Sequence, residues 1–150
     1  SARDFPGAAF VEIFQNCLVY NDKVFAEFTD RDVSSELQVV ATHGMPLVFG
    51  AERNKGLRFD PLRVRIEVVA IGKNGVTEDD ILVHDETNRT LAALLAAMQP
   101  PNHPMAIGVL YSNLVDTYES QVYGQIAAAR NGGAGLNDVI RRGHTWRVDG

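Results

Sequence analysis

Cysteine is nearly missing from this sequence of 150 residues: the chain contains one, Cys17. A single thiol cannot form an internal disulfide, and it cannot hold a metal ion without ligands from elsewhere. No apolar run approaches the roughly 20 residues that a membrane-spanning helix needs. Glycine-rich loops of the GxGxxG and GxxxxGKS types are missing too, so the usual phosphate-binding motifs of open α/β folds are absent.

An excess of positive charge is also lacking. The chain has 19 acidic and 14 basic side chains, for a net charge of −5. Nucleic-acid-binding surfaces need clustered positive charge, so we expect no nucleic-acid partner and, without a long apolar run, no membrane partner. An unpaired cysteine is typical of the reducing cytoplasm, where we expect the protein to be. The chain begins at Ser1 without methionine, which is typical of a processed chain or of a piece of a longer polypeptide.

The first half of the chain reads mainly as β-structure. The apolar run AAFVEIF predicts a buried central strand over 8–14, and KVFAEFTD predicts a short helix over 23–30 with Val24, Phe25 and Phe28 on one face. The remaining predictions are a strand over 37–42, a turn over 43–46, short β pieces over 46–50 and 56–60, a strand over 63–72 that buries Val64, Ile66 and Val68, and a turn over 73–75.

Helices dominate the second half. Thr87 or Asn88 can cap an Ala/Leu-rich helix over 89–99, which Pro100 ends. Further along, the patterns predict a buried strand over 104–111. A helix over 117–130 begins at an Asp116/Glu119 capping box and ends at Gly132 and Gly133. A short helix over 136–143 and a last strand over 144–148 are predicted after it. Helices alternating with strands, with antiparallel pieces in the middle, predict an α/β fold, and no linker divides 1–150 into more than one domain.

Cys17 directly follows the apolar run and has three interpretations. A lone cysteine beside apolar residues is most often a small buried hydrophobe. A nucleophile would need a general base, which the sequence does not place nearby. The third interpretation is one ligand of a site whose other ligands lie elsewhere.

A basic loop between two glycines is a candidate anion site. Arg53, Lys55 and Arg58 lie within GAERNKGLR, and Arg63 and Arg65 follow. One interpretation is a solvated, mobile loop. The other is electrostatic capture of a substrate carboxylate, a coenzyme A phosphate or an acidic protein.

The other polar candidates favour structural roles. The four histidines, His43, His84, His103 and His144, lack HxH or HExxH spacing, so zinc binding is disfavoured. The acidic pair after His84, Asp85 and Glu86, precedes a predicted helix and complements the positive end of its dipole; the alternative is a magnesium site. Trp146 reads as a packing anchor rather than a stacking surface.

Five segments, in order, resemble one family. VEIFQNCLVYND, LVFGAERNKGLRFD, DDILVHDETNRTLAALLAAM, PMAIGVLYSNLVDTYE and QIAAARNGGAGLNDVIRRGHTWRV are similar to segments of the thiamine-diphosphate-binding beta subunits of 2-oxoacid:ferredoxin oxidoreductases, of the 2-oxoglutarate type. The likeness covers nearly the whole chain. It implies an open α/β sheet of which this chain is the C-terminal portion, with added antiparallel elements.

The resemblance implies an activity and its partners. Such enzymes decarboxylate a 2-oxoacid on thiamine diphosphate with magnesium, pass electrons through a 4Fe-4S cluster to ferredoxin, and transfer the acyl group to coenzyme A. An alpha subunit completes the enzyme. The family's cysteine at this position supplies the fourth cluster ligand, so the resemblance implies that Cys17 is a metal ligand in the intact subunit.

Other parts of the family pattern are absent. The chain has no CxxC pair and no GDG…N motif, so we expect no cofactor on this chain alone. Where the family has ERPTY, this chain has Asn113 to Tyr118, which puts the role of that arginine in doubt. The alternative is a stand-alone, non-catalytic protein-interaction module. A chain without the rest of its sheet exposes apolar surface, so we also expect self-association.

Overall fold

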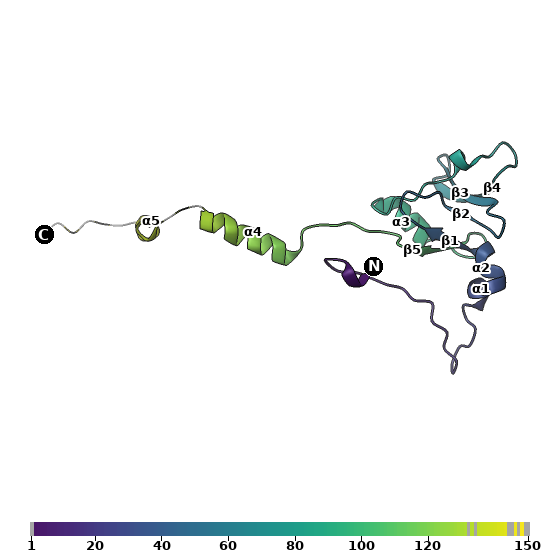
Figure 1. The fold of residues 1–150 in the computed structure, drawn as a ribbon, viewed down its shortest axis with the longest axis horizontal. Helices are drawn as coiled ribbons and strands as arrows, with labels where there is room; N and C mark the ends of the chain where they lie inside the picture. The colour runs from purple at the N-terminus through teal and green to yellow at the C-terminus, as the bar shows by residue number, and fades with distance from the viewer. Residues whose placement is uncertain (1, 132, 134, 144–145, 147, 149–150) are drawn as a thin grey trace. The chain divides into compact units, whose positions relative to one another are not determined.

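The computed structural model describes residues 2–131, 133, 135–143, 146 and 148 (Figure 1). The chain divides into two units, Val11–Asn113 and the terminal segments Ser1–Phe10 with Leu114–Gly150. The first unit carries a parallel strand pair and an antiparallel sheet together with helices. The predicted α/β class, with antiparallel pieces in the middle of the chain, is therefore confirmed.

The parallel pair joins two strands that lie far apart in the sequence. Strand β1 (Gln38–Ala41) pairs with β5 (Met105–Gly108), with Ala41 opposite Gly108. Gly108 has a φ of +107°, and a Cβ at this position would lie 2.6 Å from the carbonyl oxygen of Ala41. The close approach of the two strands therefore requires glycine. Both strands were predicted, but β5 is only partly buried, because the sheet has two strands.

The antiparallel sheet has the order β2-β3-β4. Strand β2 (Val48–Phe49) and strand β3 (Lys55–Asp60) flank the polar loop as predicted, and β4 (Arg65–Ala70) pairs with β3 along its whole length. These residues alternate between the two faces, so Leu57 and Ile66 reach the core while Arg58 and Glu67 form an ion pair.

The predicted burial of Val64 is wrong. Asp60 accepts hydrogen bonds from the backbone N–H groups of Leu62 and Arg63, which turns the chain directly after β3. This turn includes Val64, which has a φ of +52° and is 67% exposed. The buried side of the strand therefore begins at Ile66, and the predicted burial of Val68 is also wrong, since Val68 is 39% exposed.

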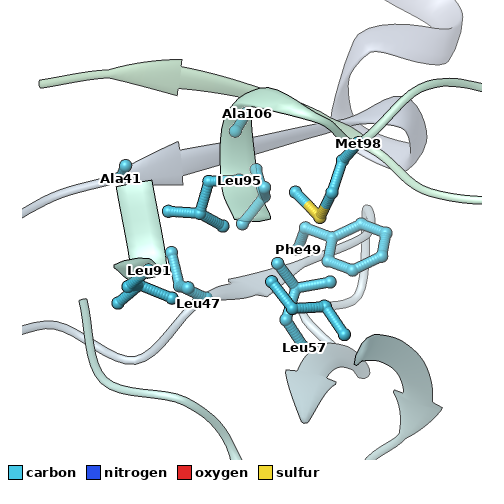
Figure 2. Close-up of a cluster of buried hydrophobic side chains, with 10 residues drawn as sticks. Ala41, Leu47, Phe49, Leu57, Leu91, Leu95, Met98 and Ala106 are labelled. Carbon is cyan, nitrogen blue, oxygen red and sulfur yellow. The ribbon is translucent and has the colours of Figure 1, made fainter. Parts of the chain in front are cut away.

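One hydrophobic core joins both sheets to helix α3 (Arg89–Ala96). Figure 2 shows side chains from α3, from the parallel pair and from the antiparallel sheet meeting in one cluster. Leu47 and Leu57 are completely buried, and Leu95 of α3 is 1% exposed. Burying each such side chain contributes about 1.5–3 kcal/mol. The members of the cluster are Val39, Ala41, Leu47, Phe49, Leu57, Ile66, Leu91, Leu95, Met98 and Ala106.

Helix α3 begins where the sequence predicts. The side-chain oxygen of Asn88 accepts hydrogen bonds from the N–H groups of Thr90 and Leu91, so Asn88, not Thr87, is the N-cap. The predicted turns are confirmed as well. His43 to Pro46 leads from β1 toward β2, and Asn74 and Gly75 are both in the left-handed region. A 3-10 helix, η2 (Glu78–Asp80), follows the second turn.

Two short helices precede β1. Helix α1 (Ala26–Thr29) is shorter than the helix predicted over 23–30, and helix α2 (Arg31–Leu37) follows it at once. The sequence reading missed α2, whose Ser34 and Ser35 weaken its helical pattern. Phe28 is buried as predicted.

The segment 8–14 is not the buried central strand predicted from its apolar run. Phe10 is 91% exposed and Ile13 is 74% exposed, and no strand of the described residues pairs with this segment. A continuous apolar run predicts burial but not the partner that provides it, and none of the described strands supplies one.

The terminal unit contains η1 (Ala2–Asp4), α4 (Tyr118–Asn131) and α5 (Leu136–Arg141). Helix α4 was predicted with Asp116 as the cap, but the Thr117 hydroxyl accepts the N–H of Ser120 in its place, at 3.2 Å. Gly132 and most of the strand predicted over 144–148, including His144, lie outside the described residues. Trp146 is described and is 84% exposed, so its predicted role as a packing anchor is wrong. None of the described helices is long and apolar enough to cross a membrane.

Candidate functional site

Asn16 closes the loop that carries Cys17. Its side-chain Nδ2 donates to Asp22 Oδ1 at 2.7 Å, and its Oδ1 accepts the backbone N–H of Lys23 at 2.6 Å. One amide therefore joins the two ends of the loop. Lys23 has a φ of +58°, and this left-handed residue turns the chain back at the clamp.

Three phenylalanine rings lie beside the same loop. The centroid of the Phe14 ring is 5.3 Å from those of Phe25 and Phe28, with tilted and edge-on geometry. Such aromatic pairs contribute about 0.5–1.5 kcal/mol beyond their buried area. Phe14 precedes the loop and Phe25 follows it, so the rings and the Asn16 clamp together hold residues 15–24 closed.

The thiol of Cys17 is exposed on this closed loop. The backbone N–H groups of Tyr20 and Val19 point to the sulfur and lower the pKa of the thiol from its ordinary value, with a smaller contribution from Asn21. Hydrogen bonds to the charged form favour thiolate. A cysteine buried among apolar residues would have a raised pKa and little solvent exposure, so the interpretation of Cys17 as a buried hydrophobe is wrong. Among the described residues no side chain is positioned beside the sulfur as a general base.

An exposed thiol whose pKa is lowered by backbone N–H groups has the chemistry of an iron–sulfur ligand. A 4Fe-4S cluster needs four such ligands, and this sequence has one cysteine. The described part of the chain contains no group of three or more His, Cys, Asp or Glu side chains suited to a metal ion. This sequence could therefore supply at most one cysteine thiolate, that of Cys17, to such a cluster.

The three basic residues predicted as an anion site differ in their contacts. Lys55 Nζ lies 2.6 Å from Glu36 Oε2, and Arg58 donates to Glu67 from two nitrogens, at 2.6 and 2.8 Å. Arg53 has no carboxylate partner within ion-pair distance among the described residues. The structure therefore leaves Arg53 as the cation of this loop that is open to a ligand.

Two histidines have structural roles. His84 is 1% exposed, and its Nε2 lies 2.8 Å from the carbonyl oxygen of Val109, just beyond β5. Its Nδ1 is buried and has no hydrogen-bond partner among the described residues. The Nε2 of His103 lies 3.0 Å from the carbonyl oxygen of Ile66 in β4. Both rings tie loops to strand ends.

The acidic residues after His84 order the turn before α3. Asp85 Oδ1 accepts the backbone N–H of Thr87 at 2.9 Å and its hydroxyl at 2.7 Å, and these contacts lower the pKa of Asp85. The Nδ1 of His43 lies 3.8 Å from Asp85 and accepts the N–H of Glu86 at 3.3 Å. The contacts favour the structural interpretation of this cluster over a magnesium site.

Sequence reasoning missed four residues that shape these two loops: Asn16, Ser34, Ser35 and Glu36. The spacing of Asn16 and Asp22 around the cysteine was a signal for a side-chain clamp, since asparagine and aspartate commonly bond to nearby backbone in turns. The roles of Ser34, Ser35 and Glu36 depend on α2 lying beside a loop some fifteen residues later, as the contact of Ala51 with Glu36 shows. No local pattern reveals that contact.

Comparison with known proteins finds a relative along the whole chain. The chain is 29% identical, over 156 aligned residues, to the 2-oxoglutarate oxidoreductase subunit KorB of Mycobacterium tuberculosis. The match covers 99% of this chain, and the chain spans 40% of the length of that relative. The resemblance predicted from the five segments is thereby confirmed. No protein-family model and no solved structure matches the chain.

Proposed function

We propose that this chain is part of the beta subunit of a 2-oxoacid:ferredoxin oxidoreductase, with 2-oxoglutarate as the substrate. The relative that aligns with this chain over 99% of the chain's length is a 2-oxoglutarate oxidoreductase subunit. The observation that carries the proposal is the Cys17 loop: a lone cysteine is held exposed on a loop closed by Asn16, in a sequence that cannot complete a metal site alone.

In this proposal Cys17 supplies one thiolate to a 4Fe-4S cluster. When bound, the cluster would carry electrons from decarboxylation of the 2-oxoacid, one at a time, toward ferredoxin. The chain's own contribution is positional. Asn16 and the three rings hold the loop closed, and the N–H groups of Tyr20 and Val19 stabilise negative charge on the sulfur.

Thiamine diphosphate, magnesium, coenzyme A and the alpha subunit belong to the same proposal. The motifs for thiamine diphosphate and magnesium are absent from this sequence, so their ligands would come from the rest of the enzyme. The exposed side chains beside Cys17 are apolar: Leu18, Val19 and Tyr20 are 79%, 82% and 92% exposed. Exposed apolar groups of this kind are typical of a surface that another chain segment covers.

The test replaces Cys17 with serine in the complete enzyme. We expect the iron and sulfide content to fall and the visible absorbance of the cluster to be lost, because serine supplies no thiolate. 2-Oxoglutarate-dependent reduction of ferredoxin should fall with them. Tyr20→Phe is the matched control, since it keeps the backbone N–H and should keep the iron content. Unchanged iron in Cys17→Ser would contradict the ligand role.

The alternative, a stand-alone interaction module, predicts something different. Such a module would need no cluster, and Cys17→Ser would leave partner binding and iron content unchanged. The isolated chain provides a second measurement. We expect it to elute as a self-associated species in size-exclusion chromatography, because the exposed apolar residues around Cys17 would be buried against a second copy of the chain. Elution as a monomer would count against this expectation.

A further inference from the structure

A pocket lies beside the Arg53 loop, within the unit Val11–Asn113. Its volume is about 260 Å³, and it is bounded by α2, β1, β2 and the loop between β2 and β3. The polar rim consists of Ser34, Ser35, Gln38 and Arg53, and the apolar wall includes Val40 and Phe49. We call it the Arg53 pocket. An apolar wall with a few placed polar groups is the usual composition of a small-molecule site.

The acceptors that could compete for Arg53 are already engaged. Glu36 uses Oε1 to accept the N–H of Ala51 at 2.8 Å and Oε2 to pair with Lys55 at 2.6 Å. The carbonyl oxygen of Ser35 accepts the N–H of Gly50 at 2.8 Å. Because the Glu36 carboxylate and the Ser35 carbonyl oxygen have partners, the pocket keeps one positive charge, on Arg53, without an ion-pair partner among the described residues.

The backbone at Arg53 is unusual for an arginine. Its φ is +50°, in the left-handed region that glycine and asparagine adopt more readily. Its N–H donates to the carbonyl oxygen of Gly50 at 2.9 Å, so a tight turn holds this conformation. Unfavourable backbone conformations that the surrounding structure maintains are concentrated at ligand sites. The turn therefore fixes the backbone from which the Arg53 side chain extends.

We propose that the Arg53 pocket binds a small organic carboxylate. The guanidinium of Arg53 pairs with the carboxylate oxygens, the hydroxyl of Ser35 adds a donor, and the aliphatic part of the ligand packs on Val40. One guanidinium matches one carboxylate. A phosphate dianion would gain from a second free cation, but Lys55 is paired with Glu36. The proposal uses no residue of the Cys17 loop and does not depend on the cluster.

The test titrates the isotopically labelled chain with glutarate in chloride buffer and follows backbone amide signals by NMR. We expect saturable shifts of the Ser34, Ser35 and Arg53 amides. Glutaramide, the neutral analogue, should cause none. Arg53→Gln should weaken binding by about tenfold or more, the loss expected for one charge-assisted contact. Lys73→Gln, a matched loss of charge in a turn outside the pocket, should leave the affinity unchanged.

Arg53→Gly separates binding from folding. Glycine adopts the left-handed backbone without strain, so this variant should unfold at no lower urea concentration than the original chain, yet it should lose glutarate binding. Three results would overturn the proposal: no saturable shift at the pocket amides, equal affinity in Arg53→Gln, or tighter binding of inorganic phosphate than of glutarate.

Discussion

The Cys17 loop and the Arg53 loop are both held by hydrogen bonds from neighbouring side chains, but they present different chemistry. The Cys17 loop is closed by its own Asn16 and by rings on either side, and it exposes a sulfur atom among apolar side chains. The Arg53 loop is attached to α2 through Ser35 and Glu36, and it exposes a cation beside hydroxyl groups.

The difference shows what each loop needs from outside. In the proposed role the Cys17 loop would supply one thiolate, and the remaining thiolates of a cluster would have to come from another segment, because this sequence has one cysteine. The pocket beside the Arg53 loop has its wall, rim and charge within one unit, so the proposed binding of a carboxylate would need no residue from outside that unit. Three changes test this contrast, from the largest expected effect to the smallest.

Leu57→Ala should produce the largest difference in local stability between the Arg53 loop and the Cys17 loop. Leu57 is completely buried in β3, close to the Arg53 loop, and its truncation should lower the free energy of unfolding by about 2–5 kcal/mol in urea denaturation. Leu62→Ala is the control, since Leu62 is 91% exposed and should change it by less than about 0.5 kcal/mol. Hydrogen exchange at the Arg53 amide should accelerate more than at Asn21, and equal acceleration would show that the loops are not independent.

Asn16→Ala should act on the Cys17 loop alone. Losing the contacts to Asp22 and Lys23 lets the loop open, so the backbone N–H groups leave the sulfur and the pKa of the thiol rises toward its ordinary value. The rate of alkylation by iodoacetamide at neutral pH should then fall about fivefold, the equivalent of one hydrogen bond. Asn102→Ala, in the turn before β5, serves as the control. An unchanged rate would mean that Asn16 does not maintain the thiolate.

Acid should act on the Arg53 loop through Glu36. The side chain of Lys55 and then the N–H of Ala51 lower the pKa of Glu36 from its ordinary value of 4.5. A group whose pKa is lower in the folded state stabilises it above the unfolded pKa, and this stability is lost as the pH falls through the folded pKa. Urea midpoints should therefore fall below about pH 4.5 more in the original chain than in Glu36→Gln. Parallel pH profiles would contradict this role.

Much of the fold could be predicted where the signal is local. Asn88 before an Ala/Leu-rich run predicted the start of α3, because a cap bonds to groups two and three residues away. The polar loop between two β pieces predicted the β2-β3 hairpin in the same way. The predictions failed where burial depends on a partner: the run 8–14 is as apolar as a core strand, but none of the described strands pairs with it.

The sequence by itself determined the α/β class, the likeness to 2-oxoacid oxidoreductase subunits and the choice of Cys17 as the candidate ligand. The class follows from periodicity and the likeness from ordered motifs, and the choice of Cys17 is what that likeness implies. Only the tertiary structure decided which cation of the basic loop is open, and that Cys17 is exposed with backbone N–H groups on its sulfur. Ion pairing and solvent exposure depend on which distant segments meet, and neighbouring residues in a sequence do not carry that information.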